Sequence, residues 1–383
     1  FALARDHNDM ERARVVCPVS TMGNWHDECR RFTPQFNPTI HAGPGRRSTV
    51  AAFADADVVL VSYDALFRDI ELFRSLPLDY LVLDEAQAVK NPGAKRRRAI
   101  SSLEIPHRLA LTGTPVENST IELWSIVDLV MPGILGSRNQ FAKTYGGAIM
   151  DKQDQNALKR LEGIIRPLVL RRTKREVAPD LPAREEQIVY AELGSRQASV
   201  YESLRSRFES EVLARVETGG MDESRMAILE AMLRLRQAAI LPALVDPDYN
   251  SVGAAKIDLL LDLIAEIRAE DNKALVFSQF TSVLDEIQDR LKSSSMPLFR
   301  IQGSTAQRVR DQQVATFQRR EGSACFLISL RAGGLGINLT AADYVLLVDP
   351  WWNPAVEAQA IDRAHRIGRA RPVFAYRLVA RGT

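Results

Sequence analysis

The sequence has few cysteines and no long apolar run. Only Cys17, Cys29 and Cys325 occur, without paired spacing, which argues against a disulfide framework or a zinc site and favours a reducing compartment. No stretch approaches the roughly 18 uninterrupted apolar residues of a membrane span, and the N-terminal residues lack the apolar core of a signal peptide. We therefore expect a soluble intracellular protein.

Net charge is also nearly absent. Lysine and arginine total 50 against 48 aspartate and glutamate, a formal charge of +2. This balance argues against a uniformly basic nucleic-acid-binding protein, although local basic patches remain compatible with it. The densest basic run, residues 95–98, is interpreted as a solvated helix face near DNA. Because 383 residues exceed the size at which one hydrophobic core keeps growing, we expect two domains.

A short apolar run at residues 81–83 leads directly into the acidic pair Asp84 and Glu85. In open α/β sheets, ligands bind beyond the carboxyl ends of buried strands. Two carboxylates there suit a nucleoside triphosphatase, since one can hold Mg2+, directly or through water, while the other deprotonates the attacking water. For an isolated Asp-Glu pair a solvated acidic turn is the better explanation, so the assignment depends on the surrounding motifs.

Buried strands alternate with helical segments in two separate parts of the chain, as in a doubly wound fold. In the first part we predict a strand opening the segment 14–20, and strands at 57–62, 81–83 and 108–111, all ending in polar residues at one edge. In the second part we predict strands at 273–278, 298–302, 325–330, 344–349 and 373–379. Between them, helical spacing over 195–214 and 223–240 predicts either a connector or a pair of helical protrusions. The predicted fold class is α/β, with two tandem parallel-sheet lobes.

These segments resemble, in order, the signature motifs of helicase superfamily two, and in detail those of the SWI/SNF-type DNA translocases. In the first lobe the matching segments are 16–20 with 24–25, 61–63, 84–87 with 90–92, and 111–115 with 117–118. In the second lobe they are 276–280, 302–304, 329–340, 349–354 and 359–368, and the connecting region matches at 123–125 and 170–174. Chance agreement of so many motifs in order is not credible.

The resemblance implies a RecA-like ATPase lobe at residues 1–130, helical protrusions and a linker at 131–255, and a second RecA-like lobe at 256–383. It implies ATP hydrolysis with Mg2+, coupled to sequence-independent movement along double-stranded DNA. A strand-separating helicase and a non-catalytic DNA-binding scaffold are the alternatives. The protein displaced from DNA, such as a nucleosome or a polymerase, stays open. The expected location is the cytoplasmic nucleoid of a bacterium or the nucleus of a eukaryote.

The resemblance also implies roles for individual residues. Asp84 and Glu85 would bind Mg2+, with Glu85 as general base. Arg363 and Arg366 would reach the γ-phosphate, and their spacing puts them on one helix face if the segment is helical; such an arginine is worth about 10^3 to 10^5 in rate. The residues expected at the nucleotide are Gln87, Thr112, Gly113, Thr114, Gly334, Gly336 and Gln359. The residues expected at DNA are Ser20, Ser62, Thr112, Gln279, Arg331 and Trp352.

One part of such an ATPase is missing from the sequence. The loop Gly-x-x-x-x-Gly-Lys-Ser/Thr, which holds the β and γ phosphates, does not occur. The glycine-containing segment 41–48 has arginine in place of lysine, the wrong spacing and the wrong position relative to 16–20. We therefore expect a chain truncated upstream of Phe1 that binds and hydrolyses ATP poorly by itself. A second departure is Arg369, where the family usually has glutamine after Arg-Ile-Gly.

Overall fold

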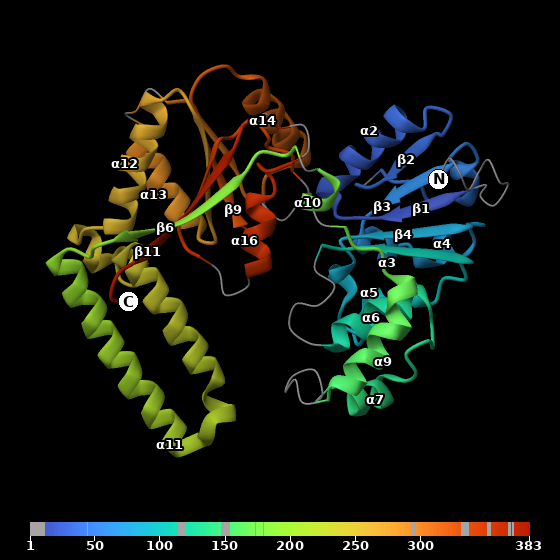
Figure 1. Cartoon of the computed structure of the whole chain (residues 1–383), viewed down its shortest axis with the longest axis horizontal. Coiled ribbons are helices and arrows are strands. Elements are labelled where there is room, and N and C mark those ends of the chain that lie inside the picture. The colour runs from blue at the N-terminus through green and yellow to red at the C-terminus, as the bar shows by residue number, and fades with distance from the viewer. Residues whose placement is uncertain are drawn as a thin grey trace. The chain divides into compact units, whose positions relative to one another are not determined.

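The computed structural model describes residues 12–43, 45–113, 120–146, 154–172, 174–178, 180–292, 294, 296–330, 337–350, 354–366, 369 and 371–383. The chain divides into two compact units, Phe1–Thr173 and Lys174–Thr383 (Figure 1). Their boundary lies inside the stretch 131–255, and the three-part division with that middle segment stays a prediction. Among the described helices, none combines the length and apolar character that a membrane crossing requires.

The first unit contains a five-stranded parallel sheet in the order β2-β3-β1-β4-β5. Its strands are β1 (Ala13–Val16), β2 (Pro38–His41), β3 (Val58–Val61), β4 (Tyr80–Asp84) and β5 (His107–Leu111). The prediction that the four expected strands end at one edge is confirmed, because all pair in parallel. The sequence missed β2, a short segment with proline, threonine and histidine that becomes a strand by pairing with β3.

Helices cover this sheet on both faces, and alternate strand residues belong to different cores. Val59 and Val61 face the core that contains Phe53, Phe73 and Ile100, whereas Val58 and Leu60 face the one with Met22 and Cys29. The helices of the unit are α2 (Met22–Phe32), α3 (Tyr63–Arg68), α4 (Ile70–Arg74), α5 (Lys95–Ser101), α6 (Thr120–Val130), α7 (Arg138–Phe141) and α9 (Gln155–Ile165). A separate cluster of Trp124, Phe141 and Leu161 holds α6, α7 and α9 together.

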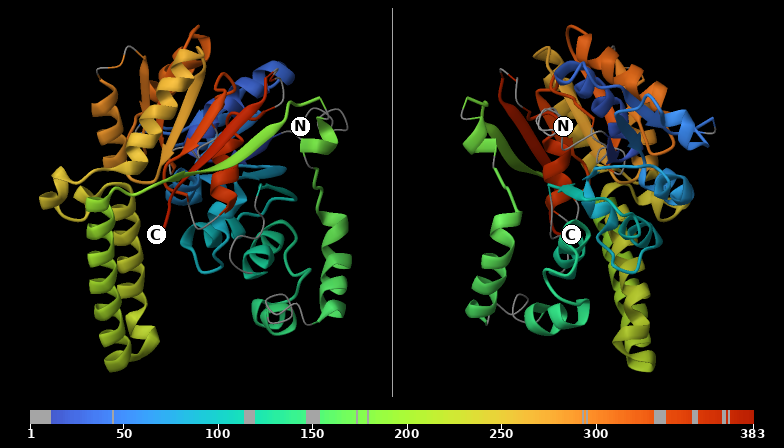
Figure 2. Two further views of the ribbon diagram at one scale, coloured as in Figure 1. Left: turned by 60° about the vertical axis from the view of Figure 1, so that its left-hand side comes forward. Right: turned by 90° about the vertical axis from the view of Figure 1, so that its right-hand side faces the viewer.

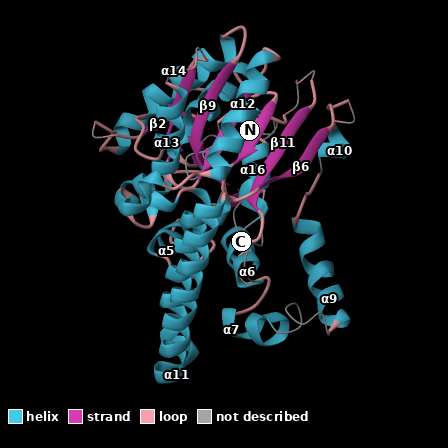
Figure 3. Ribbon diagram, turned by 90° about the vertical axis from the view of Figure 1, so that its left-hand side faces the viewer, coloured by secondary structure: helices cyan, strands magenta, loops and turns pink. Residues whose placement is uncertain are grey.

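The second unit contains a six-stranded parallel sheet in the order β6-β11-β10-β7-β9-β8. Its strands are β6 (Arg184–Ala191), β7 (Lys273–Ser278), β8 (Leu298–Ile301), β9 (Ala324–Ser329), β10 (Tyr344–Leu347) and β11 (Val373–Ala380). Five of these were predicted. The sequence missed β6, whose charged first half has no buried-strand pattern; it pairs along its whole length with β11 at the sheet edge (Figure 3).

The longest helix of the second unit is α11 (Ser195–Ile240), which contains both predicted helical segments. It runs out from the sheet and returns as a second arm beside the first (Figures 1 and 2). The prediction of a pair of helical protrusions at the lobe boundary stays a prediction. The other helices are α10 (Lys174–Val177), α12 (Ala255–Ala269), α13 (Thr281–Leu291), α14 (Gln307–Arg319) and α16 (Pro354–Ile361). Two separate hydrophobic cores of the second unit include residues of these helices. One contains residues of α12 and α13, and the other contains residues of α14 and α16.

Candidate functional site

The carboxyl edge of the first sheet carries the predicted acidic pair. β4 ends at Asp84, and Glu85 follows with φ 51° and ψ 52°. This left-handed conformation is uncommon for a residue other than glycine, and such conformations gather at active sites and ligand clamps. The turn ends the strand and leads into the short 3-10 helix Ala86–Val89. Both carboxylates are thereby held in a bend at the end of a buried strand.

Asp84 is oriented by three hydrogen bonds. The indole Nε1 of Trp25 donates to Asp84 Oδ2 over 2.9 Å, and the backbone N–H of Glu85 donates to Asp84 Oδ1 over 3.0 Å. The hydroxyl of Tyr63 donates to the Asp84 backbone oxygen over 2.8 Å. Burial, and then the nearby Asp84 charge, raise the pKa of Tyr63, so this phenol stays a donor. The direction of the Asp84 carboxylate is therefore set before any ligand binds.

A series of hydrogen bonds joins Glu85 to the neighbouring strand. Gln87 Nε2 donates to Glu85 Oε2 over 2.5 Å, and Thr112 Oγ1 donates to Gln87 Oε1 over 2.7 Å. Thr112 directly follows β5, which pairs with β4. The structure thus brings together four predicted site residues from two strand ends, with Gly113 next in the chain. It adds Trp25, which the sequence placed in a motif without a role in the site.

The two predicted serines of the first unit follow β1 and β3 at this same edge. Ser20 lies in the turn after β1, and its hydroxyl is buried without a hydrogen-bond partner among the described residues. Ser62 caps α3, because its Oγ accepts a hydrogen bond from the backbone N–H of Ala65 over 3.1 Å. Both side chains are therefore near the strand ends, but Ser62 also has a local structural role.

The basic run at residues 95–98 is not uniformly solvated. Arg97 is buried in α5, donates to Ser125 Oγ over 2.8 Å and forms a 2.6 Å ion pair with Asp128. The interpretation of the whole run as a solvated face is wrong at this position, because an α-helix turns one of four consecutive side chains toward its core. Arg98 on the same helix is exposed.

In the second unit, Gln279 lies beside a buried group of charges. Its backbone N–H donates to both carboxylate oxygens of Asp349, over 3.0 and 3.2 Å. Burial raises the pKa of Asp349 and lowers the pKa of Lys256, and the opposite charges of the pair oppose both shifts. Arg236 on α11 donates to the Pro350 oxygen over 2.8 Å. The sequence missed Lys256 and Arg236, which lie outside the recognised motifs, and the fold alone brings them to the end of β10.

The predicted arginines follow α16. That helix contains Gln359 and ends at Ile361, so Arg363 and Arg366 lie in the succeeding turn, and the condition for a shared helix face, a helical segment, is not met. The Arg363 oxygen accepts a hydrogen bond from the Leu339 N–H over 3.0 Å, which holds the turn against the segment before β10. The predicted site residues outside the described part of the chain are Thr114, Arg331, Gly334, Gly336 and Trp352.

The donor set suits magnesium better than a transition metal. Within the described residues, no group of three or more His, Cys, Asp and Glu side chains is placed to hold a metal ion. Mg2+ needs only one or two carboxylates when phosphates and water supply its other ligands, whereas structural zinc needs four protein ligands. Asp84 and Glu85 at the strand end therefore fit a Mg2+–nucleotide complex.

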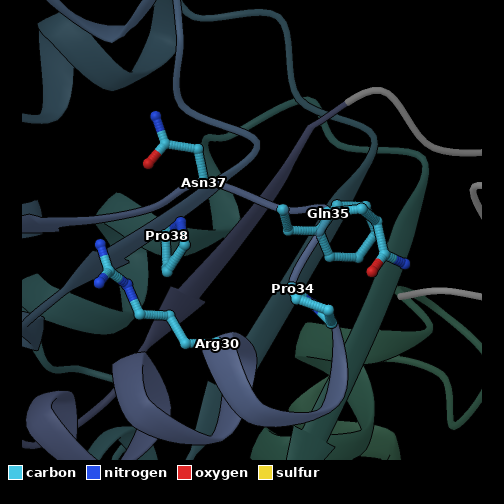
Figure 4. Close-up of a pocket in the computed structure, with 6 residues that line it drawn as sticks. Arg30, Pro34, Gln35, Asn37 and Pro38 are labelled. Carbon is cyan, nitrogen blue, oxygen red and sulfur yellow. The ribbon is translucent and has the colours of Figure 1, made fainter.

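One hollow in the first unit lies apart from this edge. It has a volume of about 470 Å³ and is lined by Arg30, Pro34, Gln35, Phe36, Asn37 and Pro38 (Figure 4). Pro38 begins β2, so the hollow lies at the amino-terminal edge of the sheet, opposite Asp84 and Thr112. It contains no residue of the predicted site.

A family model described as SNF2-related domain matches residues 2–244, and one described as helicase conserved C-terminal domain matches residues 255–368. The chain belongs to the SNF2-related family. This confirms the resemblance found in the sequence, and both parallel sheets agree with the predicted fold class. The two matched regions together include every predicted site residue, and Arg369 lies directly after the second region.

Similar proteins are longer than this SNF2-related chain. A putative ATP-dependent helicase/translocase YwqA of Bacillus subtilis is 39% identical over 381 residues, covering 96% of this chain and 41% of that protein. The ISWI chromatin-remodeling complex ATPase ISW1 of Saccharomyces cerevisiae is 32% identical, covering 95% and 34%. A solved Sulfolobus solfataricus SWI2/SNF2 ATPase core in complex with dsDNA is 31% identical with a TM-score of 0.47, covering the whole chain and 80% of that one.

Proposed function

We propose that this chain is the motor of an ATP-driven translocase on double-stranded DNA that displaces or remodels DNA-bound proteins. The observation that carries the proposal is the hydrogen-bonded series Glu85–Gln87–Thr112 beside an oriented Asp84. This series links the proposed general base Glu85, next to the proposed metal ligand Asp84, to Thr112 in the loop after β5. Family membership and the relatives' names support ATP as the fuel.

In this mechanism Asp84 would hold Mg2+, directly or through water, and the Trp25 N–H would fix the position of Asp84 Oδ2. When bound, ATP would supply the electrophilic γ-phosphorus, and Mg2+ would neutralise the charge that develops on the phosphate oxygens. Glu85 accepts the proton of the attacking water at a carboxylate oxygen, while Gln87 holds Oε2. Arg363 and Arg366 contact the γ-phosphate and stabilise the transition state.

The loop after β5 couples hydrolysis to movement. Because Thr112 donates to Gln87, a shift of this loop changes the partner that orients Glu85. Phosphate contacts by the hydroxyls and amide at the strand ends give sequence-independent, salt-sensitive binding. The residues proposed for DNA contact are Ser20, Ser62, Thr112, Gln279, Arg331 and Trp352. Those proposed for the nucleotide are Gln87, Thr112, Gly113, Thr114, Gly334, Gly336 and Gln359.

The partner and the compartment follow from the substrate. ISW1 is named as a chromatin-remodeling ATPase, which supports a nucleosome as the displaced partner. Another DNA-bound protein, such as a polymerase, is the alternative. The protein then works where DNA is, in the cytoplasmic nucleoid of a bacterium or the nucleus of a eukaryote.

The test measures phosphate release with and without duplex DNA. The 383 residues contain no Gly-x-x-x-x-Gly-Lys-Ser/Thr, so it is run on this chain and on a version extended upstream. DNA-stimulated release that Glu85→Gln lowers at least about a hundredfold supports the proposal, since general-base catalysis contributes about 10^2 to 10^4. The matched control is Glu104→Gln, at an exposed glutamate, which should leave the rate unchanged. Binding of DNA without phosphate release from either version favours a non-catalytic scaffold.

A second assay separates translocation from strand separation. A motor that moves along intact duplex displaces a third strand from a triplex without releasing either strand of a labelled duplex. Release of a single strand from the labelled duplex contradicts the proposed output and favours a strand-separating helicase.

A further inference from the structure

Arg369 uses all five of its side-chain N–H groups. Nε donates to the Arg371 oxygen over 2.6 Å, and Nη1 donates to the oxygens of Thr340 and Ala342, each over 2.5 Å. Nη2 donates to Asp343 Oδ1 over 2.9 Å and to the Pro372 oxygen over 3.0 Å. A guanidinium has five donors in a fixed planar fork, so no donor of this side chain is left over.

The site around Arg369 is built for this side chain. Only 9% of the residue is exposed, and burial lowers its pKa while Asp343 opposes that effect. Lysine keeps the charge but gathers three donors on one nitrogen, and glutamine has two N–H donors. Neither can reach four carbonyl oxygens and a carboxylate at once. The partners lie in two segments that the guanidinium holds together, 340–343 before β10 and 371–372 before β11.

Backbone hydrogen bonds link the Arg369 cluster to both predicted catalytic arginines, Arg363 and Arg366. The Leu339 N–H donates to the Arg363 oxygen over 3.0 Å, and Leu339 precedes the Thr340 carbonyl that Arg369 binds. The Arg369 N–H donates to the Arg366 oxygen over 3.3 Å. A closed path of backbone and side-chain bonds therefore runs from Arg363 through 339–340 and Arg369 to Arg366.

Further hydrogen bonds, from α14 and from the start of β7, hold the segment 339–343 in place. Gln318 on α14 accepts a hydrogen bond from the Ala341 N–H over 2.8 Å and donates to Thr340 Oγ1 over 3.2 Å. Asp343 Oδ2 accepts from the Lys273 N–H at the start of β7 over 3.3 Å. The segment 339–343 is thus fixed to the sheet and to α14, so a bond from Arg369 to it transfers that rigidity to the turn bearing the arginines.

We propose that Arg369 is a positioning residue, which sets the placement of the Arg363 and Arg366 backbone for transition-state stabilisation through its five hydrogen bonds. The inference rests on the proposed ATP hydrolysis. It gives a role to the position at which this chain departs from the glutamine usual in its family.

The test compares Arg369→Lys with the control Arg371→Lys, two residues away. The exposed Arg371 side chain acts on Arg369 only through its charge, which lysine keeps, and the bond to Arg369 uses only the Arg371 backbone oxygen. Arg369→Lys should lower kcat for DNA-stimulated phosphate release about tenfold, equivalent to about 1.4 kcal/mol. KM for ATP and Kd for duplex DNA should change less than about twofold. Hydrogen exchange should become faster in 337–343 and 360–366 but not in β7 and β9. Arg371→Lys should match the wild type in every measurement.

The outcomes that overturn the proposal are distinct from those that overturn the function. An active wild type whose Arg369→Lys variant keeps its kcat contradicts positioning alone. Faster exchange throughout β7 and β9 shows that Arg369 only stabilises the fold, and this also overturns positioning. A wild type extended upstream that binds DNA but releases no phosphate contradicts the proposed function. In that case the hydrogen-exchange comparison still tests whether Arg369 holds the turn at 360–366. Unchanged exchange in 360–366 of Arg369→Lys overturns the positioning role.

Discussion

The indole N–H of Trp25, on α2, donates to the carboxylate of Asp84, at the end of β4, over 2.9 Å. A partner that orients a metal ligand typically changes metal affinity or activity 10- to 100-fold when removed. Trp25→Phe keeps the aromatic bulk and removes the donor. We expect the Mg2+ concentration for half-maximal phosphate release to rise at least about tenfold. The control is Phe32→Ala on the same helix, because this side chain is exposed. An unchanged Mg2+ dependence would show that the Trp25 bond only packs α2 against the sheet.

Thr112→Val tests the link from β5 to the acidic pair. The substitution keeps the branched shape and removes the Oγ1 donor to Gln87. A lost hydrogen bond of this kind is worth about 1 kcal/mol, so we expect kcat with DNA to fall about fivefold while KM for ATP stays within twofold. Thr49→Val, at an exposed threonine whose side chain makes no capping bond, is the control. Steady-state kinetics over a range of ATP concentrations checks this, and a rise in KM alone contradicts it.

Arg97→Met tests whether the basic run at 95–98 is structural at its buried member. Removing Arg97 leaves the partly buried carboxylate of Asp128 without its partner. Breaking a buried ion pair in this way costs about 3 kcal/mol. We expect the first unit to lose about that much free energy of unfolding in urea titrations. Arg98→Met on the exposed face should change it by less than about 0.5 kcal/mol. Equal losses from both variants would contradict the distinction between the two arginines.

His41 makes the first unit sensitive to acid. Burial lowers the pKa of His41, although its hydrogen bond to Asp69 opposes the shift. Because the unfolded chain takes up the proton near pH 6.5 and the folded chain does so only at lower pH, the free energy of unfolding falls as pH drops below about 6.5. Urea titrations between pH 7.5 and 5.5 measure this, and His41→Gln should flatten the dependence. His26→Gln, at a histidine whose side chain is 26% exposed, is measured beside it as the matched substitution. A wild type without any dependence contradicts the prediction.

Local pattern was enough for the interior of both sheets and for the residues at their strand ends. β7 and β9 are buried along their whole length, so they occur in the sequence as apolar runs that no surface helix would show. Since parallel strands end at one edge, the polar residues after each run mark a common site without any knowledge of the fold. Asp84, Glu85, Gln87 and Thr112 are together for this reason.

Only the tertiary structure decided which partners those residues have. Trp25 and Asp84 are 59 positions apart, and Lys256 and Asp349 are farther still, so no local periodicity relates them. The edge strand β6 exists because β11 supplies its hydrogen bonds, not because its charged sequence favours a strand. Arg369 was a single unexplained departure in the sequence, and it became a fork with five partners once folding had brought 340–343 and 371–372 around it. Sequence pattern records which face of an element is buried, whereas hydrogen bonds between distant segments depend on how the elements pack.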